Sequence, residues 1–168
     1  RSGFDLAVSM RATSSQWQRQ LIEIAKSMWE EIGARVSIRI LSEKDFMNQR
    51  TSGNLVCYTA SWAADYDDPD NFIFTFFGTP ENTRFRSLCY ADTNIMQRVR
   101  NARAITDAQK RLQEYHELEH RIVQDDAAWI PLFSRDRHFL VSNRVENFTT
   151  SWNGWFETSY KYMSIRKS

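Results

Sequence analysis

The sequence predicts an α/β fold in which helices cover a mostly parallel sheet. Two patterns within residues 1–62 carry this prediction. Short runs of alternating apolar residues are typical of strands, whereas the longer segments between them have apolar residues at helical spacing. Strands that alternate with helices in this way pair in parallel, because each helix returns the chain to the same edge of the sheet.

The early elements have clear start and stop signals. Alternation from Phe4 to Met10 predicts a half-buried strand, Ser14 and Ser15 suit a helix start, and Gly33 suits the end of that helix. Gly53 ends a second, shorter helix in the same way. The predicted order is a strand over 4–10, a helix over 13–33, a strand over 36–40, a helix over 42–53 and a strand over 55–62.

The second half is predicted to be mainly helical. Pro69 suits the first turn of a short helix, Asp92 is a capping residue, and Thr106 with Gln109 forms a capping box. We expect Leu112 on the buried stripe of the last helix. The predicted elements are a helix over 71–77, an exposed loop over 79–87, two helices that start near 92 and 106, and strands over 127–133 and 138–141.

Composition narrows the class of partner. With 22 basic and 21 acidic side chains the formal net charge is +1, which favours neither nucleic acid nor an anionic membrane. No apolar run approaches the ~18 residues that a membrane span needs. The two cysteines, Cys57 and Cys89, are too few for a disulfide scaffold, and we expect both to be small buried side chains.

The most informative segment is Trp62 to Phe72, which follows the third predicted strand. It places an indole and four carboxylates at a strand's carboxyl end, where open α/β sheets bind ligands. A carboxylate beside an apolar wall suits a cationic group such as an amine. Asp65 is the candidate for that role, although it also fits a helix cap or a turn. Three others are predicted to be turn and cap residues: Asp67, Asp68 and Asp70.

A metal site is the main alternative. His116 to His120 matches the H-E-x-x-H pattern of zinc hydrolases, in which two imidazoles on one helical face bind zinc and Glu117 activates water. The predicted buried stripe turns both histidines toward the polar side, and no third-ligand motif follows. A calcium loop that starts at Asp65 fails as well, because Phe76 stands where a glutamate is required.

Several motifs together resemble those of the large solute-binding proteins of ABC transporters for peptides, nickel complexes and related solutes. These are Gly33 before an alternating strand, Trp62 with Asp65 and the DPDNF segment 68–72, and Ile130 to Leu132 after a long helix. DPDNF is most similar to the dipeptide-binding branch. The resemblance implies a periplasmic-binding-protein-like (type II) lobe, and the early entry from Arg1 into a strand agrees with the C-terminal part of a longer, two-lobed protein.

The same resemblance implies the organisation and the setting. Residues 1–142 would be the C-terminal lobe, and residues 143–168 a tail that returns to the other lobe. The receptor would close on a peptide-like solute for the membrane subunits of an ABC importer, without a catalytic residue, a metal or a cofactor. Its expected location is periplasmic or extracellular, with a lipid anchor as one option. A further alternative is a truncated structure whose tail pairs with a second copy by strand exchange.

Three residues carry over onto binding positions of the family. Asp65 falls where peptide-binding members pair a carboxylate with the ligand's α-ammonium group, Trp62 on a cleft-lining aromatic position, and Arg11 near an arginine for the ligand's carboxylate. The chain departs from the family's pattern in two places. Thr79 stands where Cys89 would need a disulfide partner, and Thr59 stands where some relatives carry an arginine.

Overall fold

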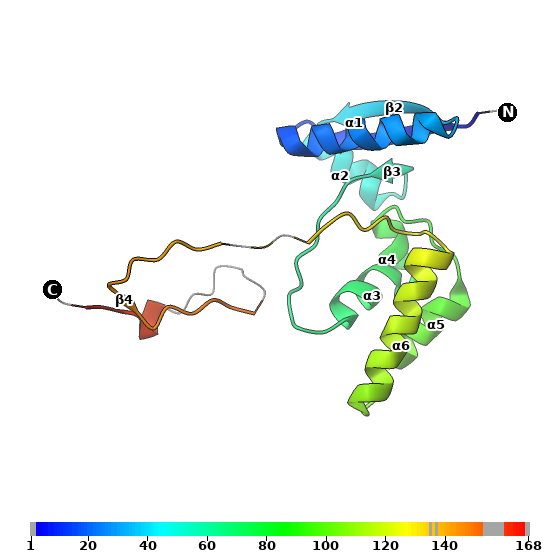
Figure 1. The fold of residues 1–168 in the computed structure, drawn as a ribbon. Coiled ribbons are helices and arrows are strands. Elements are labelled where there is room, and N and C mark those ends of the chain that lie inside the picture. The colour runs from blue at the N-terminus through cyan, green and yellow to red at the C-terminus, as the bar shows by residue number, and fades with distance from the viewer. Residues whose placement is uncertain (1–2, 135, 137, 153–159, 167–168) are drawn as a thin grey trace.

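The computed structural model describes residues 3–134, 136, 138–152 and 160–166. It confirms the α/β fold, with a three-stranded parallel sheet in the order β2-β1-β3 (Figure 1). Strand β1 pairs with β2 along its whole length, from Asp5 opposite Arg35 to Arg11 opposite Leu41. The elements of this part are β1 (Asp5–Arg11), α1 (Gln16–Glu31), β2 (Arg35–Leu41), α2 (Glu43–Thr51) and β3 (Cys57–Tyr58).

A small core holds α1 against the sheet. It consists of the buried residues Val8, Met10, Ile22, Ala34 and Val36. The helix begins where predicted: the backbone N–H of Ser15 donates to Gln18 Oε1 at 2.8 Å, which completes part of a capping box. It ends at Gly33, whose φ of +97° lies in the left-handed region that only glycine adopts without strain.

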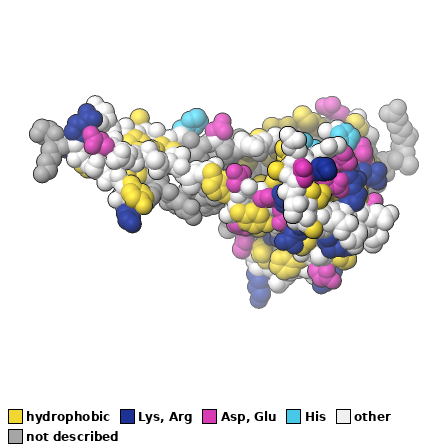
Figure 2. Space-filling model, turned by 90° about the horizontal axis from the view of Figure 1, so that it is seen from below, with side chains coloured by type: hydrophobic (Ala, Val, Ile, Leu, Met, Phe, Trp, Pro, Cys, Tyr) yellow, Lys and Arg dark blue, Asp and Glu magenta, His cyan; other side chains and the backbone are white. Residues whose placement is uncertain are grey.

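A second, helical layer follows the sheet along the chain (Figure 1). Its helices are α3 (Asp70–Phe77), α4 (Pro80–Phe85), α5 (Thr93–Ala102) and α6 (Ala108–His120), and α6 continues into a π-helical segment at Arg121–Asp125. They enclose the larger core of Ile73, Phe76, Phe77, Ile95, Val99, Ala102, Tyr115, Leu118 and Ile122. Acidic and basic side chains are interspersed over the visible face, in keeping with the balanced composition (Figure 2).

Three predictions about the helical half were wrong in detail. Residues 80–85 form α4 instead of a loop, because the Thr79 hydroxyl accepts from Asn82 N at 3.1 Å and Pro80 suits the first turn. Asp107, and not Thr106, caps α6 by accepting from Lys110 N at 2.9 Å. Leu112 is exposed. The side of α6 that faces the core includes position 111 in the first turn, and Leu112 lies outside that side.

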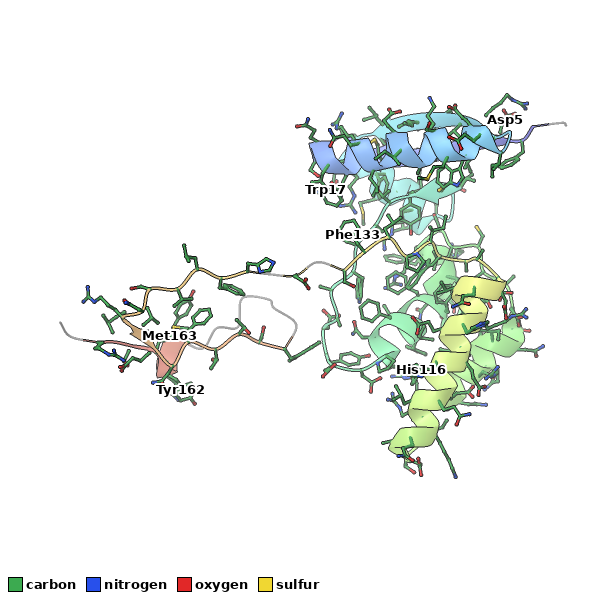
Figure 3. All side chains as sticks on the ribbon, in the orientation of Figure 1. Asp5, Trp17, His116, Phe133, Tyr162 and Met163 are labelled. Atoms are coloured by element: carbon green, nitrogen blue, oxygen red, sulfur yellow. The ribbon has the colours of Figure 1, made fainter. Side chains whose placement is uncertain are left out.

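The predicted strands beyond residue 55 were also wrong in extent. The third strand was expected over 55–62, but only Cys57 and Tyr58 pair with β1 before the chain leaves the sheet. The segments 127–133 and 138–141 have no strand partner among the described residues, and a strand without a ladder leaves its backbone groups to water. They have no regular secondary structure. One aromatic contact ties this region to α1, since the rings of Phe133 and Trp17 lie 5.7 Å apart (Figure 3).

The C-terminal segment runs away from both layers (Figure 1). Within the described residues its regular structure is a short antiparallel pair, β4 (Val145–Glu146) with β5 (Ser164–Ile165), and a 3₁₀ turn at Tyr160–Tyr162. Large apolar side chains are exposed along it: Phe139, Leu140, Trp152, Tyr160, Tyr162 and Ile165. The division at residue 142 stays a prediction. None of the described helices is long and apolar enough to cross a membrane.

Candidate functional site

The three predicted ligand-binding residues lie at or beyond the same edge of the sheet. Arg11 is the last residue of β1, while Trp62 and Asp65 follow β3 by a few residues. Because β1 and β3 are parallel, their carboxyl ends meet at one edge. The shared edge is therefore the place to search for a binding surface.

Asn71 fixes the two residues that follow β3. Its side-chain oxygen accepts one hydrogen bond from the Trp62 indole nitrogen at 2.8 Å and another from the Asp65 backbone N–H at 3.1 Å. Asn71 is 2% exposed and lies in the first turn of α3, so the acceptor itself is rigidly held. Sequence reasoning had assigned Asn71 no role, although it belongs to the DPDNF segment.

The ring of Trp62 is packed in part and exposed in part. It meets Phe76 edge to face, with centroids 5.3 Å apart, and 39% of the residue remains exposed. With the indole nitrogen bound to Asn71, the ring is oriented before any ligand arrives. It can serve as an apolar wall at low cost in conformational entropy.

The Asp65 side chain is exposed, and its carboxylate makes no hydrogen bond or ion pair with any residue that the structure describes. It is neither sealed in the interior nor neutralised by a lysine or arginine. Asp67, which is also exposed, lies two residues away. A cation that approached this edge would meet an available carboxylate.

Asp68 is committed to the structure. Arg111 donates to both of its oxygens, at 2.6 and 2.8 Å, and the backbone N–H of Asp70 donates to it at 2.8 Å. The hydrogen bonds from Arg111 lower the pKa of the Asp68 carboxyl, against a smaller opposing effect of burial. The prediction of a local turn role for Asp68 is correct but incomplete, because the partner comes from α6.

Asp70 is an interior carboxylate and not a simple cap. It is 5% exposed and accepts hydrogen bonds from Tyr66 at 2.9 Å and Tyr115 at 3.1 Å. The Nε atom of Arg103 lies 3.1 Å from it. Burial, followed by the charge of Asp70, raises the pKa of the Tyr115 hydroxyl, so this phenol stays protonated and donates. The interaction joins α3 to α5 and α6.

Arg11 is already engaged, but weakly. Its guanidinium group lies 3.4 Å from Glu43, 3.6 Å from the Met47 sulfur and 4.8 Å from the centre of the Phe46 ring. Both members of the ion pair with Glu43 are largely exposed, and such pairs contribute little to stability. Arg11 therefore remains able to exchange Glu43 for another anion.

The histidine pair and the cysteines have no part in this edge. His116 and His120 both lie on the exposed face of α6, as the pattern predicted (Figure 3). No group of three or more potential metal ligands occurs among the described residues. Cys57 is half-buried and Cys89 is exposed, so the prediction that both are buried was wrong for Cys89 and only partly right for Cys57. The Cys89 thiol lies 4.0 Å from the backbone oxygen of Gly53.

Residues 3–84 match the family model described as bacterial extracellular solute-binding proteins, family 5. The chain is 27% identical over 128 residues to a probable D,D-dipeptide-binding periplasmic protein of Escherichia coli. The aligned region covers 73% of this chain and 24% of that protein. The chain is also 24% identical over 145 residues to the periplasmic oligopeptide-binding protein of the same organism, which covers 86% and 26%.

A crystal structure agrees with the fold. The substrate-binding domain of an oligopeptide ABC transporter from Bacillus anthracis superposes with a TM-score of 0.72 at 21% identity, over 97% of this chain and 31% of that one. The chain spans about a quarter of the length of the curated relatives it matches. The chain is therefore similar to a fragment of the bacterial extracellular solute-binding proteins of family 5, with the family match carried by residues 3–84.

Proposed function

We propose that this chain is the C-terminal lobe of a two-lobed receptor that binds a peptide-like solute and delivers it to an ABC importer. The relatives support this class of solute, since their names specify a D,D-dipeptide and oligopeptides. In this proposal residues 1–142 form the lobe and residues 143–168 return to the other lobe. The receptor works outside the cytoplasmic membrane, in the periplasm or at the cell surface.

The observation that carries the proposal is the exposed carboxylate of Asp65, which has no partner among the described residues, beside the oriented ring of Trp62. The Asp65 carboxylate accepts charge-assisted hydrogen bonds from the ligand's ammonium group, and Trp62 covers the adjacent apolar part of the ligand. Closure of the second lobe excludes water and strengthens this ion pair, because the local dielectric constant falls.

Arg11 contributes a second, opposite charge at the same edge. Its exposed contact with Glu43 at 3.4 Å is weak enough to be replaced. We assign Arg11 to an anionic group of the ligand or to a contact with the second lobe. Asp65 and Arg11 together favour a ligand that carries both charges.

Calorimetry on the full-length protein tests the role of Asp65. In Asp65→Asn the shape of the side chain is kept and its charge is lost, so affinity for L-alanyl-L-alanine should fall about tenfold to a hundredfold, the value of a charged hydrogen bond. Asp67→Asn is the matched control, because Asp67 is a nearby exposed carboxylate. Equal losses in the two variants, or none in Asp65→Asn, would refute the assignment.

A further inference from the structure

Two arginines converge on Tyr58, the last residue of β3. Arg50 lies on α2, and Arg86 directly follows α4. The Tyr58 hydroxyl donates a hydrogen bond to the backbone oxygen of Arg86. Burial raises the pKa of Tyr58, whereas a hydrogen bond from Arg50 and the charges of Arg50 and Arg86 lower it. The Ser87 hydroxyl donates to the backbone oxygen of Arg50 at 2.8 Å, which brings the end of α2 next to Arg86.

Neither arginine has an acidic partner in the part of the chain that the structure describes. The Nε atoms of both are buried without a hydrogen-bond partner, and the hydrogen bond from the Arg86 side chain is a long one, 3.5 Å to the Asn82 oxygen. Burial and the neighbouring charge of Arg50 lower the pKa of Arg86. Apart from a hydrogen bond between Arg50 and Tyr58 and the Phe76 ring beside Arg86, the described residues offer these two partly buried like charges no compensation.

Other arginines of the lobe are compensated. Arg98, Arg103 and Arg111 each have a carboxylate oxygen within 3.1 Å. Burying a charge is costly unless an opposite charge or hydrogen bonds compensate for it. The contrast indicates that the partner of Arg50 and Arg86 is an anion that binds from outside the described residues.

The arginine pair adjoins the candidate site. The guanidinium carbon of Arg86 lies 4.6 Å from the centre of the Phe76 ring and 5.7 Å from that of Trp62. An anion held by Arg86 would therefore lie close to the indole that we assign to the ligand. The planar, forked donors of a guanidinium group match a carboxylate in particular.

We propose that Arg50 and Arg86 form a carboxylate-binding subsite beside Trp62. The subsite gives the receptor a preference for ligands with a free carboxylate in addition to the amine at Asp65; this part rests on the proposed function. The carboxylate has two sources, a free ligand or an acidic side chain elsewhere in the same protein, and the experiment separates them.

The test uses the full-length protein and the double variant Arg50→Met, Arg86→Met, which keeps the length of the side chains and removes their charge. Arg84→Met is the control, because Arg84 is an exposed arginine on α4. Calorimetry measures the affinity for L-alanyl-L-alanine and for its C-terminal amide, L-alanyl-L-alaninamide. Thermal unfolding without ligand is recorded for every variant.

The wild type and Arg84→Met should bind the free acid about tenfold or more tightly than the amide, which is the value of one charged hydrogen bond. The double variant should lose most of this preference and keep only the part that Arg11 contributes, with an unliganded Tm equal to or above that of the wild type, because a charge repulsion is removed. Equal binding of acid and amide by the wild type, with a lower Tm in the double variant, would identify a carboxylate of the protein itself as the partner.

An acid-to-amide ratio and a Tm that the double substitution leaves unchanged would overturn the subsite. If the wild type binds neither peptide, the proposed function fails for dipeptides, and a second measurement decides about the subsite alone. Acetate, compared with chloride at equal ionic strength, should then raise the Tm of the wild type but not of the double variant. The absence of that difference would contradict the assignment.

Discussion

Asn71→Ala should loosen the candidate site and lower the stability of the lobe together. The Asn71 oxygen is the shared acceptor for the Trp62 indole nitrogen at 2.8 Å and the Asp65 backbone N–H at 3.1 Å. Both donors lose their protein partner in the variant. Trp62 then loses the contact that orients its ring, and the backbone at Asp65 becomes free to move.

The expected loss follows from these two bonds. Each hydrogen bond of this kind contributes about 1 kcal/mol net, and a donor left without a partner in a buried setting costs about 1 to 3 kcal/mol. The partly exposed indole can recover a bond to water, so we expect a total loss of about 2 to 3 kcal/mol. This is a substantial part of the roughly 5 to 15 kcal/mol that holds a typical domain folded.

Equilibrium urea unfolding measures this change. This chain has six tryptophans, so a difference between the native fluorescence of the variant and that of the wild type reports a changed environment of an indole such as Trp62. Asn101→Ala is the matched control, because the exposed side chain of Asn101 accepts a single hydrogen bond, from Gln97 at 2.8 Å. The control should change stability by less than about 0.5 kcal/mol. A loss for Asn71→Ala no larger than this, with unchanged fluorescence, would refute the role of Asn71.

Three further outcomes are expected. Arg111 lowers the folded-state pKa of Asp68, so their contact stabilises the fold above the unfolded pKa near 3.8, and this stabilisation is lost as the pH falls through the lower folded pKa. Asp68→Asn should therefore flatten the dependence of the unfolding free energy on pH below 4. An unaltered acid profile would contradict this. Gly33→Ala should destabilise the protein by about 1 kcal/mol in urea unfolding, because the φ of Gly33 is +97°. An added Cβ would meet no atom within 4 Å, so the cost is conformational alone. A stabilised variant would exclude the left-handed conformation at Gly33. In thiol titration with a disulfide reagent, the exposed Cys89 should react first and Cys57 slowly, because burial raises the pKa of the Cys57 thiol; equal rates would contradict the difference in burial.

Local sequence was sufficient for the elements that obey local rules. Helix α1 lies between a capping box at Ser15 and the left-handed Gly33, and both signals are contained within a few residues of chain. Alternation likewise revealed β1 and β2. Where sequence reasoning failed, as at residues 127–133, alternation predicted a strand that has no neighbour to pair with. Pairing depends on distant parts of the chain, which periodicity does not report.

The sequence by itself determined the class of fold and the carboxyl-end position of the acidic segment, because both follow from order along the chain, and it made Asp65 a candidate. Only the tertiary structure distinguished the carboxylates within that segment. Asp68 and Asp70 meet Arg111 and Arg103 from helices more than thirty residues away, whereas the Asp65 carboxylate meets no described partner. Whether a carboxylate is available to a ligand depends on which side chains the fold brings within a few ångströms of it. In this segment those side chains are Arg103, which directly follows α5, and Arg111 of α6.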